Sequence, residues 1–502
     1  MKPVSTLYRE NLSLLTDLYQ LTMAYAAWKT GGTEKVGVFE LYFRQNPFKG
    51  GYAIHSGLEA VLDFISSFKI DDSQTKYLAE LKGANGKALF DKGFIDYLEN
   101  LKLTVDVDAV EEGRVVFATE PLYRVTGPVV QCQLLETPLL NFVNFGTLIA
   151  TKASRVKEAA GKDPVLEFGL RRAQGSDGGI NASRSAYIGG ADGTSNVAAG
   201  KVFGIPLKGT HAHSWVMSFE DELDSFMKFA EAMPDNCIFL VDTYDTIQGV
   251  KNAIKAGLWL KERGHKMLGI RLDSGDLAYL SIEARKLLDA AGLQEASIVA
   301  SNDLDETLIT SLKHQGAKID TWAVGTKLVT AFDQPALGGV FKLTSIKLTP
   351  GSDWRDQIKL SEQINKITNP GIHQVRRFFD NGLFVGDMIY DLRDQNSLAP
   401  AIVDAKDPTR SKKFGGSVQH EDLLIPVVRN GELVYVVPTL AKVKQRRDQD
   451  IAKLHPAVRR FVNPHEYPVG LEPSLHSRKS AMIINLRNAK DHAASDETGS
   501  LP

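Results

Sequence analysis

The middle of the chain alternates short apolar runs with longer amphipathic stretches. Runs of strand length occupy residues 164–168, 201–207, 237–241, 266–271, 296–300 and 321–324. Apolar residues recur with a helical period at 139–159, 184–187, 218–232, 247–256, 277–291 and 303–314. Strands that alternate with helices are typical of a parallel sheet covered by helices. We therefore predict an α/β unit for this part of the chain.

Each of these strand candidates is followed by a cluster of polar residues. The clusters occupy residues 171–172, 210–213, 242–245, 271–276, 301–305 and 325–326. In a barrel, the loops after the strands build the active site, whereas an open sheet concentrates its ligands at one switch point. Six clusters favour an irregular, TIM-like α/β barrel.

The patterns on either side of this unit are different. Before it, we predict helices at 11–28, 58–68 and 90–101 and β-structure at 36–43, 103–110, 115–119 and 125–135. After it come β segments at 340–348 and 375–384, a hairpin at 423–435 with an Asn-Gly turn, and a helix at 451–462. We expect an N-terminal α+β domain (1–135), the barrel (136–345) and a C-terminal part (346–502) that packs with the N-terminal domain. The polar tail from about residue 487 is expected to be frayed.

Composition excludes several classes of protein. The 502 residues carry 59 basic and 61 acidic side chains, a net charge of −2, so nothing favours nucleic acid as a partner. Two cysteines, Cys132 and Cys237, fit a reducing compartment. No apolar run approaches the roughly 18–20 residues of a membrane span, and the N-terminus lacks the apolar core of a signal peptide. We expect a cytoplasmic protein.

The segment KGTHAHS (208–214) is the first candidate for chemistry. If 205–210 is a strand and Ser214 caps a helix, His211 and His213 lie at the carboxyl end of that strand. An imidazole there can act as a base, a metal ligand or a nucleophile toward phosphorus. Two loop histidines with purely local partners are the plain alternative.

The segment RLDSGD (271–276) is the second candidate. The guanidinium of Arg271 suits phosphate, Asp273 suits ribose hydroxyls or Mg²⁺, and a glycine lets backbone amides approach an anion. An Arg–Asp ion pair at a helix start is the simpler interpretation. The turns at 301–303 and 325–327 can also hold phosphate, and one of Arg171 and Arg172 can pair with a carboxylate. The motifs GxxxxGK[ST], GxGxxG and HExxH are absent.

Taken together, eight ordered segments closely resemble the nicotinate phosphoribosyltransferase family. They are TDLYQLTM (16–23), FELYFR (39–44), GYAIHSGL (51–58), ETPL (136–139), EFGLRRAQG (167–175), GTHAH (209–213), RLDSGD (271–276) and KITNPG (366–371). This resemblance implies the fold predicted above, an irregular α/β barrel with a second domain built from both chain ends. It also implies synthesis of nicotinate mononucleotide and diphosphate from nicotinate and 5-phosphoribosyl 1-diphosphate, the entry step of NAD salvage. ATP hydrolysis would be coupled through a phosphorylated histidine.

The resemblance also assigns residues. His213 would be the phosphorylated histidine, while His211 receives no role. Arg171 would pair with the carboxylate of nicotinate, with Arg172 as the alternative. Thr210 would form a hydrogen bond near the bound nicotinate. Tyr19 would stack on the pyridine ring from the second subunit of a homodimer. Phosphates, ribose and Mg²⁺ would be held by Arg271, Asp273, Ser274, Asn302, Gly325, Thr326 and Thr368, with no dedicated protein metal site.

Three other functions remain open at this stage. The nicotinamide enzyme is the nearest, but a neutral amide needs no arginine to balance its charge. A quinolinate enzyme fits less well, because its product loses a carboxylate and its family is shorter. A binding or regulatory protein on this fold would bind these ligands without turnover.

Overall fold

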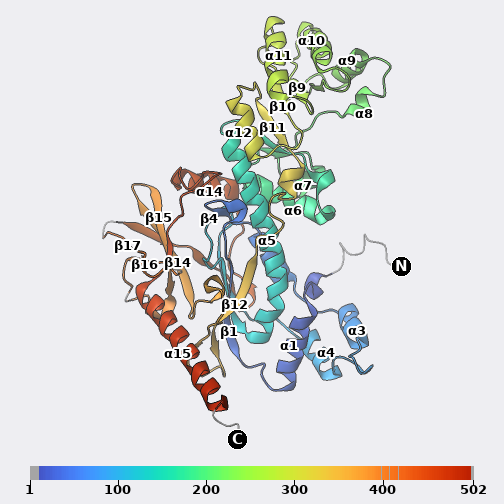
Figure 1. Cartoon of the computed structure of the whole chain (residues 1–502). Coiled ribbons are helices and arrows are strands. Elements are labelled where there is room, and N and C mark those ends of the chain that lie inside the picture. The colour runs from blue at the N-terminus through green and yellow to red at the C-terminus, as the bar shows by residue number, and fades with distance from the viewer. Residues whose placement is uncertain (1–10, 397, 406, 416–417, 499–502) are drawn as a thin grey trace.

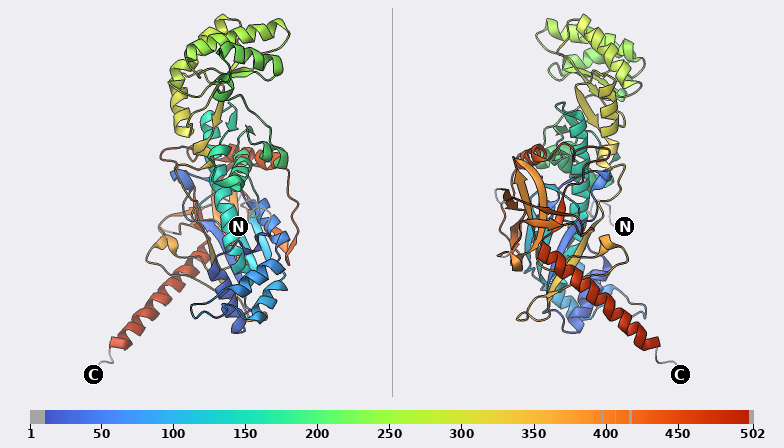
Figure 2. Two further views of the ribbon diagram at one scale, coloured as in Figure 1. Left: turned by 90° about the vertical axis from the view of Figure 1, so that its right-hand side faces the viewer. Right: turned by 60° about the vertical axis from the view of Figure 1, so that its left-hand side comes forward.

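The computed structural model describes residues 11–498 except 397, 406, 416 and 417. The molecule is elongated (Figure 1): one end carries α8–α11, the other carries α1, α3 and α4, and α5 runs between them. Two further views agree on this arrangement and show α15 projecting from the sheet-rich part (Figure 2). No helix among the described residues combines the length and the apolar character needed to cross a membrane.

The predicted α/β unit contains one sheet of six parallel strands. In spatial order they are β7 (Gly193–Thr194), β6 (Val165–Glu167), β11 (Thr321–Val324), β10 (Ser297–Ala300), β9 (Gly269–Leu272) and β8 (Ile238–Leu240). In the part of the chain that the structure describes, the edge strands β7 and β8 are not paired with each other, so the ring is not closed. The α/β class is confirmed.

Helix α5 precedes these strands along the chain, and the other helices of this unit come between or after them. The helices are α5 (Val129–Ala160), α6 (Gly175–Ile188), α7 (Val197–Phe203), α8 (His213–Val216), α9 (Glu222–Ala232), α10 (Thr246–Glu262), α11 (Leu277–Ala290), α12 (Glu306–His314) and α13 (Thr326–Val329). Four of them begin with an aspartate whose carboxylate accepts a hydrogen bond from a first-turn amide: Asp221, Asp245, Asp276 and Asp305. Such caps stabilise a helix start by about 1 kcal/mol each and fix where the polar loop ends.

The second part of the molecule is built from both chain ends, as predicted. A seven-stranded antiparallel sheet has the order β13 (Arg355–Asp356), β12 (Gly339–Lys347), β1 (Val36–Phe43), β5 (Tyr123–Pro128), β3 (Asp106–Val110), β19 (Leu424–Arg429), β20 (Glu432–Leu433). A six-stranded sheet has the order β17 (Ser411–Lys413), β16 (Ala401–Val403), β21 (Val469–Leu471), β15 (Leu383–Asp391), β14 (His373–Asp380), β18 (Gln419–Asp422). A small pair joins β2 (Ala53–Ile54) to β4 (Val115–Val116).

The remaining helices surround these sheets. They are η2 (Leu12–Leu14), α1 (Leu18–Lys29), η3 (Pro47–Lys49), α2 (Leu58–Ser67), α3 (Asp72–Glu80), α4 (Lys92–Glu99), η5 (Ile364–Lys366), η6 (Leu392–Asp394), α14 (Leu440–Lys453) and α15 (Pro473–Thr498). The predicted helix at 11–28 is therefore two elements, η2 and α1, and the hairpin at 423–435 is confirmed as β19–β20.

Four predictions about local structure are wrong. The run 201–207 is not a strand: α7 covers its start, and only Leu207 makes a bridge, to Thr194. The β-rich run 125–135 ends at Pro128, after which α5 begins. Ser214 does not cap a helix, because α8 begins at His213 after Ala212.

The fourth is the helix predicted at 451–462, where the structure ends α14 at Lys453. Pro456 explains this ending, since proline lacks the amide hydrogen and disfavours helix in the residue before it. The backbone of α15 is helical through Thr498, where the sequence predicted a frayed tail.

Candidate active site

Polar side chains from three neighbouring strand ends meet around Arg271. This residue lies on β9, and the parallel register places it beside Leu240 of β8 and Val299 of β10. Its Nε donates to the Ser301 hydroxyl (2.9 Å) and its Nη1 to the Thr210 hydroxyl (3.1 Å). Its Nη2 donates to Oδ1 of Asp273 at 3.0 Å. The guanidinium is therefore fixed in one orientation at the strand ends, which suits recognition of an anion.

Asp242 lies two residues after the end of β8 and holds the loop that follows β9. Its Oδ2 accepts hydrogen bonds from the backbone amide of Asp273 (2.8 Å) and from the Ser274 hydroxyl (2.7 Å). Its Oδ1 is buried and has no hydrogen-bond partner among the described residues. A carboxylate oxygen left without a partner beside a second carboxylate is the kind of donor that a hydrated Mg²⁺ prefers.

His213 stands at the edge of this cluster. Its Nδ1 lies 3.1 Å from the Thr243 hydroxyl, and its Nε2 lies 3.7 Å from Oδ2 of Asp273. The side chain is 39% exposed, so a ligand in the cluster can reach the ring. A hydroxyl on one ring nitrogen and a carboxylate near the other orient the imidazole, as nucleophilic histidines require.

His211 has a different environment. Its ring packs among Phe226, Phe229 and Phe239, and its Nε2 accepts a hydrogen bond from the backbone amide of Leu240 at 3.2 Å. Burial, together with the nearby charge of Arg271, lowers the pKa of His211 to about 4. The neutral ring therefore fastens the loop to the end of β8, and its role is structural.

Arg171 and Arg172 follow β6 in a short helical turn, η4 (Leu170–Arg172). Both side chains are exposed, and neither guanidinium has a hydrogen bond or ion pair with another described residue. The turn itself is held by Glu167, a buried carboxylate that accepts from the Gly169 amide and from the hydroxyls of Ser183 (2.7 Å) and Thr194 (2.6 Å). Two guanidinium groups are thus available to an anionic ligand at this strand end.

The turns after β10 and β11 complete the rim. Asn302 adopts φ = +90°, and Gly325 precedes α13. A Cβ on Gly325 would lie 3.2 Å from the carbonyl oxygen of Phe168, so the β6 and β11 loops approach each other closely at this glycine. Thr326 is the first residue of α13.

Two of the residues assigned by the resemblance lie apart from this cluster. Tyr19 lies on α1, at the opposite end of the molecule from α8 and β9 (Figures 1 and 2), and is 49% exposed. Thr368 lies between η5 and β14 in the sheet-rich part, where its buried hydroxyl accepts from the backbone amide of Lys359 at 2.9 Å. Within one chain the structure does not bring either of them to Arg271.

Asp242, Thr243 and Glu167 were not predicted as site residues, and Ser301 was predicted only as part of a turn that can hold phosphate. Asp242, Thr243 and Ser301 lie in clusters that were noticed because they follow strands, but no motif distinguished them from ordinary turn residues. Their contacts with Arg271, Asp273 and His213 depend on strands that are neighbours in space, and the order of those strands is not written in any one segment.

The fold and this cluster define an α/β protein with a polar cluster, centred on a fixed arginine, at the carboxyl ends of a parallel sheet. Three family descriptions match the chain: the nicotinate phosphoribosyltransferase N-terminal domain at residues 14–144, the nicotinate phosphoribosyltransferase family at 164–381 and its C-terminal domain at 372–479. The chain belongs to the nicotinate phosphoribosyltransferase family.

Similar proteins from distant organisms support the same family membership. The nicotinate phosphoribosyltransferase of Bacillus subtilis is 43% identical over 97% of this chain and 98% of its own length. That of Dictyostelium discoideum is 40% identical over 92% and 86% of the two chains. The crystal structure of human nicotinic acid phosphoribosyltransferase superimposes with a TM-score of 0.79 at 31% identity, covering 93% of this chain and 99% of the human one.

Proposed function

We propose that this protein makes nicotinate mononucleotide and diphosphate from nicotinate and 5-phosphoribosyl 1-diphosphate, as a step of NAD salvage. The observation that carries the proposal is the fixed guanidinium of Arg271 between Thr210, Ser301 and Asp273, with Asp242 beside it. Membership of the family supports the same reaction.

The diphosphate end of the substrate would occupy the strand-end cluster. Arg271 pairs with phosphate oxygens, and the rim residues Ser274, Asn302, Gly325 and Thr326 bind phosphate or ribose. Asp242 and Asp273 would hold Mg²⁺, since one or two carboxylates plus substrate phosphates are its usual ligands. Bound Mg²⁺ supplies positive charge against the diphosphate that departs.

Nicotinate would enter from the side of η4. One of Arg171 and Arg172 pairs with its carboxylate; both side chains are exposed and neither guanidinium has a partner among the described residues, which supports this role. The pyridine nitrogen forms the new bond to ribose C1 while the bond from C1 to the diphosphate oxygen breaks. No general base is needed, because the attacking nitrogen carries no proton; positioning and charge stabilisation are the requirements.

ATP would act through His213. The γ-phosphoryl group passes to the imidazole with release of ADP, and the phosphohistidine is later hydrolysed. The contact between Nδ1 and Thr243 leaves Nε2 as the nucleophilic nitrogen. A phosphoryl group there would add negative charge beside Asp273, and Mg²⁺ held by Asp242 and Asp273 would supply positive charge to offset it. Each tenfold gain in substrate affinity requires about 1.4 kcal/mol of preference for the phosphorylated state.

The active enzyme would be a homodimer in which the partner's Tyr19 stacks on the nicotinate ring. Two observations support this arrangement. Tyr19 is far from the strand ends of its own chain, and α1 exposes three large apolar side chains, Leu18 (55%), Tyr19 (49%) and Met23 (37%). An apolar helix face of this kind is typical of an interface. Soluble substrates and two buried free cysteines fit a cytoplasmic location.

The test is a direct assay. The protein is incubated with 5-phosphoribosyl 1-diphosphate, Mg²⁺ and either nicotinate or nicotinamide, with and without ATP, and mononucleotide and ADP are measured. We expect product from nicotinate, more of it with ATP, and no ATP effect in His213→Ala. An equal ATP effect in the variant would refute the role of His213 alone. A preference for nicotinamide would refute the role of the Arg171–Arg172 pair, and no turnover with either would refute the proposed reaction.

A further inference from the structure

A cavity of about 410 Å³ lies in the sheet-rich part of the molecule, where residues near β1, β4, β16, β21 and α15 converge. Its wall is partly apolar, with Phe117, Ile364 and Ile402, and partly polar, with Asn369 and Lys479. None of the residues that contact Arg271 at the strand ends lines it. Volumes of about 300–1,000 Å³ are usual for small-molecule sites.

Lys479 is the unusual member of this wall. It lies on α15 and is only 8% exposed, yet its Nζ makes one hydrogen bond, to Oδ1 of Asn369 at 2.8 Å. No carboxylate of the described residues lies within ion-pair distance of it. Burial lowers the pKa of Lys479 to about 8, which leaves the ammonium mostly protonated at neutral pH.

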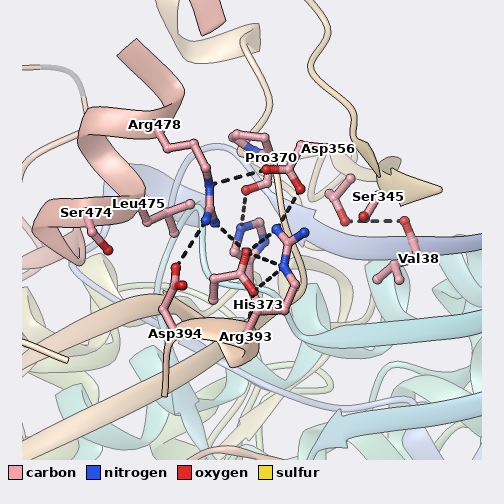
Figure 3. Close-up of polar contacts among 12 residues, drawn as sticks. Val38, Ser345, Asp356, Pro370, His373, Arg393, Asp394, Ser474, Leu475 and Arg478 are labelled. Atoms are coloured by element: carbon pink, nitrogen blue, oxygen red, sulfur yellow. Dashed lines mark hydrogen bonds and ion pairs between the residues drawn. The ribbon is translucent and has the colours of Figure 1, made fainter. Parts of the chain in front are cut away.

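The adjacent residue of α15 shows that the surrounding strands and turns can supply counter-charges to a cation on this helix. Arg478 forms ion pairs with Asp356 (3.2 Å), Asp394 (3.1 Å) and Asp391, as Figure 3 shows for the labelled residues. The side chain of Lys479 instead contacts the neutral amide of Asn369. A buried cation without a counter-charge is costly, and proteins retain one mainly where a ligand supplies the opposite charge.

The other charged residues of the wall do not neutralise Lys479. Glu466 pairs with Arg410 at 3.5 Å, and the Nζ of Lys412 donates to the carbonyl of Val385 at 2.7 Å. Asp404 also lines the cavity but does not form an ion pair with Lys479. Thr119, another wall residue, has φ = +75°, a conformation that is rare for a β-branched residue and tends to occur at functional sites.

We propose that this cavity binds a small organic anion whose carboxylate or phosphate pairs with Lys479 and whose body lies against Phe117, Ile364 and Ile402. The site is separate from the strand-end cluster of the same chain. The inference therefore goes beyond the proposed function and does not depend on it.

The experiment measures thermal unfolding with added anions. Full-length Arg271→Ala is the background, because it weakens anion binding at the strand ends. Inorganic phosphate, AMP and benzoate are added separately at about 10 mM, which distinguishes a bare anion, a phosphate with an organic body and a carboxylate with an organic body. We expect AMP or benzoate to raise Tm by about 2 °C. That shift should be lost in Lys479→Met and kept in Lys479→Arg.

The matched control is Lys413→Met, which removes an exposed lysine of β17 that does not line the cavity and should keep the shift. If Lys479→Met does not fold, Lys479→Gln preserves a donor to Asn369 and gives the same readout. Shifts of equal size with and without the Lys479 charge, or no shift with any of the three anions, would overturn the proposal. A Lys479-dependent shift supports it even if the protein makes no nicotinate mononucleotide.

Discussion

At the scale of single residues, the two histidines of one short segment have different tasks. His211 is buried against aromatic rings and accepts a hydrogen bond from the Leu240 amide, whereas His213 is partly exposed beside Asp273. Spacing alone gives both rings the same chance of taking part in chemistry. The strand end at β8 separates them, because it supplies a backbone donor to one and a polar cluster to the other.

The first prediction concerns the pH dependence of stability through His211. Its pKa falls from about 6.5 in the unfolded chain to about 4 in the folded one, so folding favours the neutral ring. The contribution of the neutral His211 ring to the free energy of unfolding is fully present above pH 6.5 and is lost as the pH falls toward 4. It amounts to about 3 kcal/mol in total, with about 2 kcal/mol lost by pH 5. His211→Gln keeps an acceptor for the Leu240 amide but does not titrate.

Chemical denaturation at pH 7.5 and pH 5.0 checks this. The variant should lose less stability than the wild type over that interval, while His265→Gln, a change in a histidine paired with Asp235 on the surface, should behave as the wild type does. Parallel losses in wild type and His211→Gln would show that other groups control the acid sensitivity.

The second prediction concerns Asp242. In Asp242→Asn one oxygen can still accept from Asp273 and Ser274, but the negative charge beside the partnerless oxygen is removed. We expect weaker Mg²⁺ binding and a fall in kcat/KM of about 10–100-fold, the usual effect of losing one metal-site interaction. The Mg²⁺ concentration at half-maximal rate should rise in the variant. Asp235→Asn, before β8, is the control, and an unchanged Mg²⁺ requirement in Asp242→Asn would contradict the assignment.

The sequence predicts the site residues that lie in distinctive motifs, but not those that lie in ordinary turns. Arg271, Asp273 and His213 lie in motifs dense enough to be noticed, and the structure brings them together. Asp242 and Ser301 lie in ordinary turns. Their importance depends on the order β8–β9–β10 in the sheet, a long-range property that residue spacing does not encode.

At the scale of elements, strand and helix ends were predictable where local chemistry agrees with the apolar pattern. The aspartate caps of α10, α11 and α12 follow their strands directly, and these elements were found. The run 201–207 was misassigned because Val202, Phe203 and Ile205 resemble a strand. Two local signals oppose that pattern: Asn196 caps α7 through the Ala199 amide, and Gly204 ends it in a left-handed conformation, φ = +69°.

The third prediction tests how closely α10 packs on the strand end. A Cβ on Gly249 would lie 1.9 Å from the carbonyl oxygen of Val241, the residue before Asp242. Gly249→Ala must push α10 away from β8, which costs about 1–3 kcal/mol of stability and displaces Asp242. We expect lower Tm and lower kcat/KM together.

The matched control is Gly178→Ala in α6, where a Cβ meets no atom within 4 Å. That change should leave stability unchanged or raise it by about 0.5–1 kcal/mol, because alanine favours helix over glycine. Equal Tm values for the two variants would show that α10 has room to shift without cost.

At the scale of the whole molecule, the arrangement of the two parts separates Tyr19 from the cluster around Arg271. The sequence of α1 predicts an apolar helix face, but it does not predict that Tyr19 lies far from the Arg271 cluster of its own chain. Leu18, Tyr19 and Met23 nevertheless remain 37–55% exposed, so the described residues of a single chain leave this face partly uncovered. The proposed homodimer uses a second copy to cover α1 and to bring Tyr19 to the partner's strand-end cluster.

The fourth prediction uses two defective variants to test that arrangement. Tyr19→Ala and Asp273→Ala should each have low activity alone, since one lacks the stacking ring and the other lacks part of the strand-end cluster. In a mixed dimer, the intact cluster of the Tyr19→Ala subunit receives the intact Tyr19 of the Asp273→Ala subunit, so one site of two is complete. The purified mixed dimer should therefore recover about half of the wild-type activity, whereas an unfractionated random mixture, in which half of the dimers are mixed, should recover about a quarter.

The mixture is prepared by co-refolding or co-expression with two affinity tags, and the mixed dimer is purified before assay. Recovery well above the sum of the two parents requires that Tyr19 acts across the interface. If each chain used its own Tyr19, every site in the mixture would carry a defect, and no recovery would occur. Mixing Asp273→Ala with Arg271→Ala is the control, because both changes lie in the same strand-end cluster and their mixed dimers contain no complete site under either arrangement.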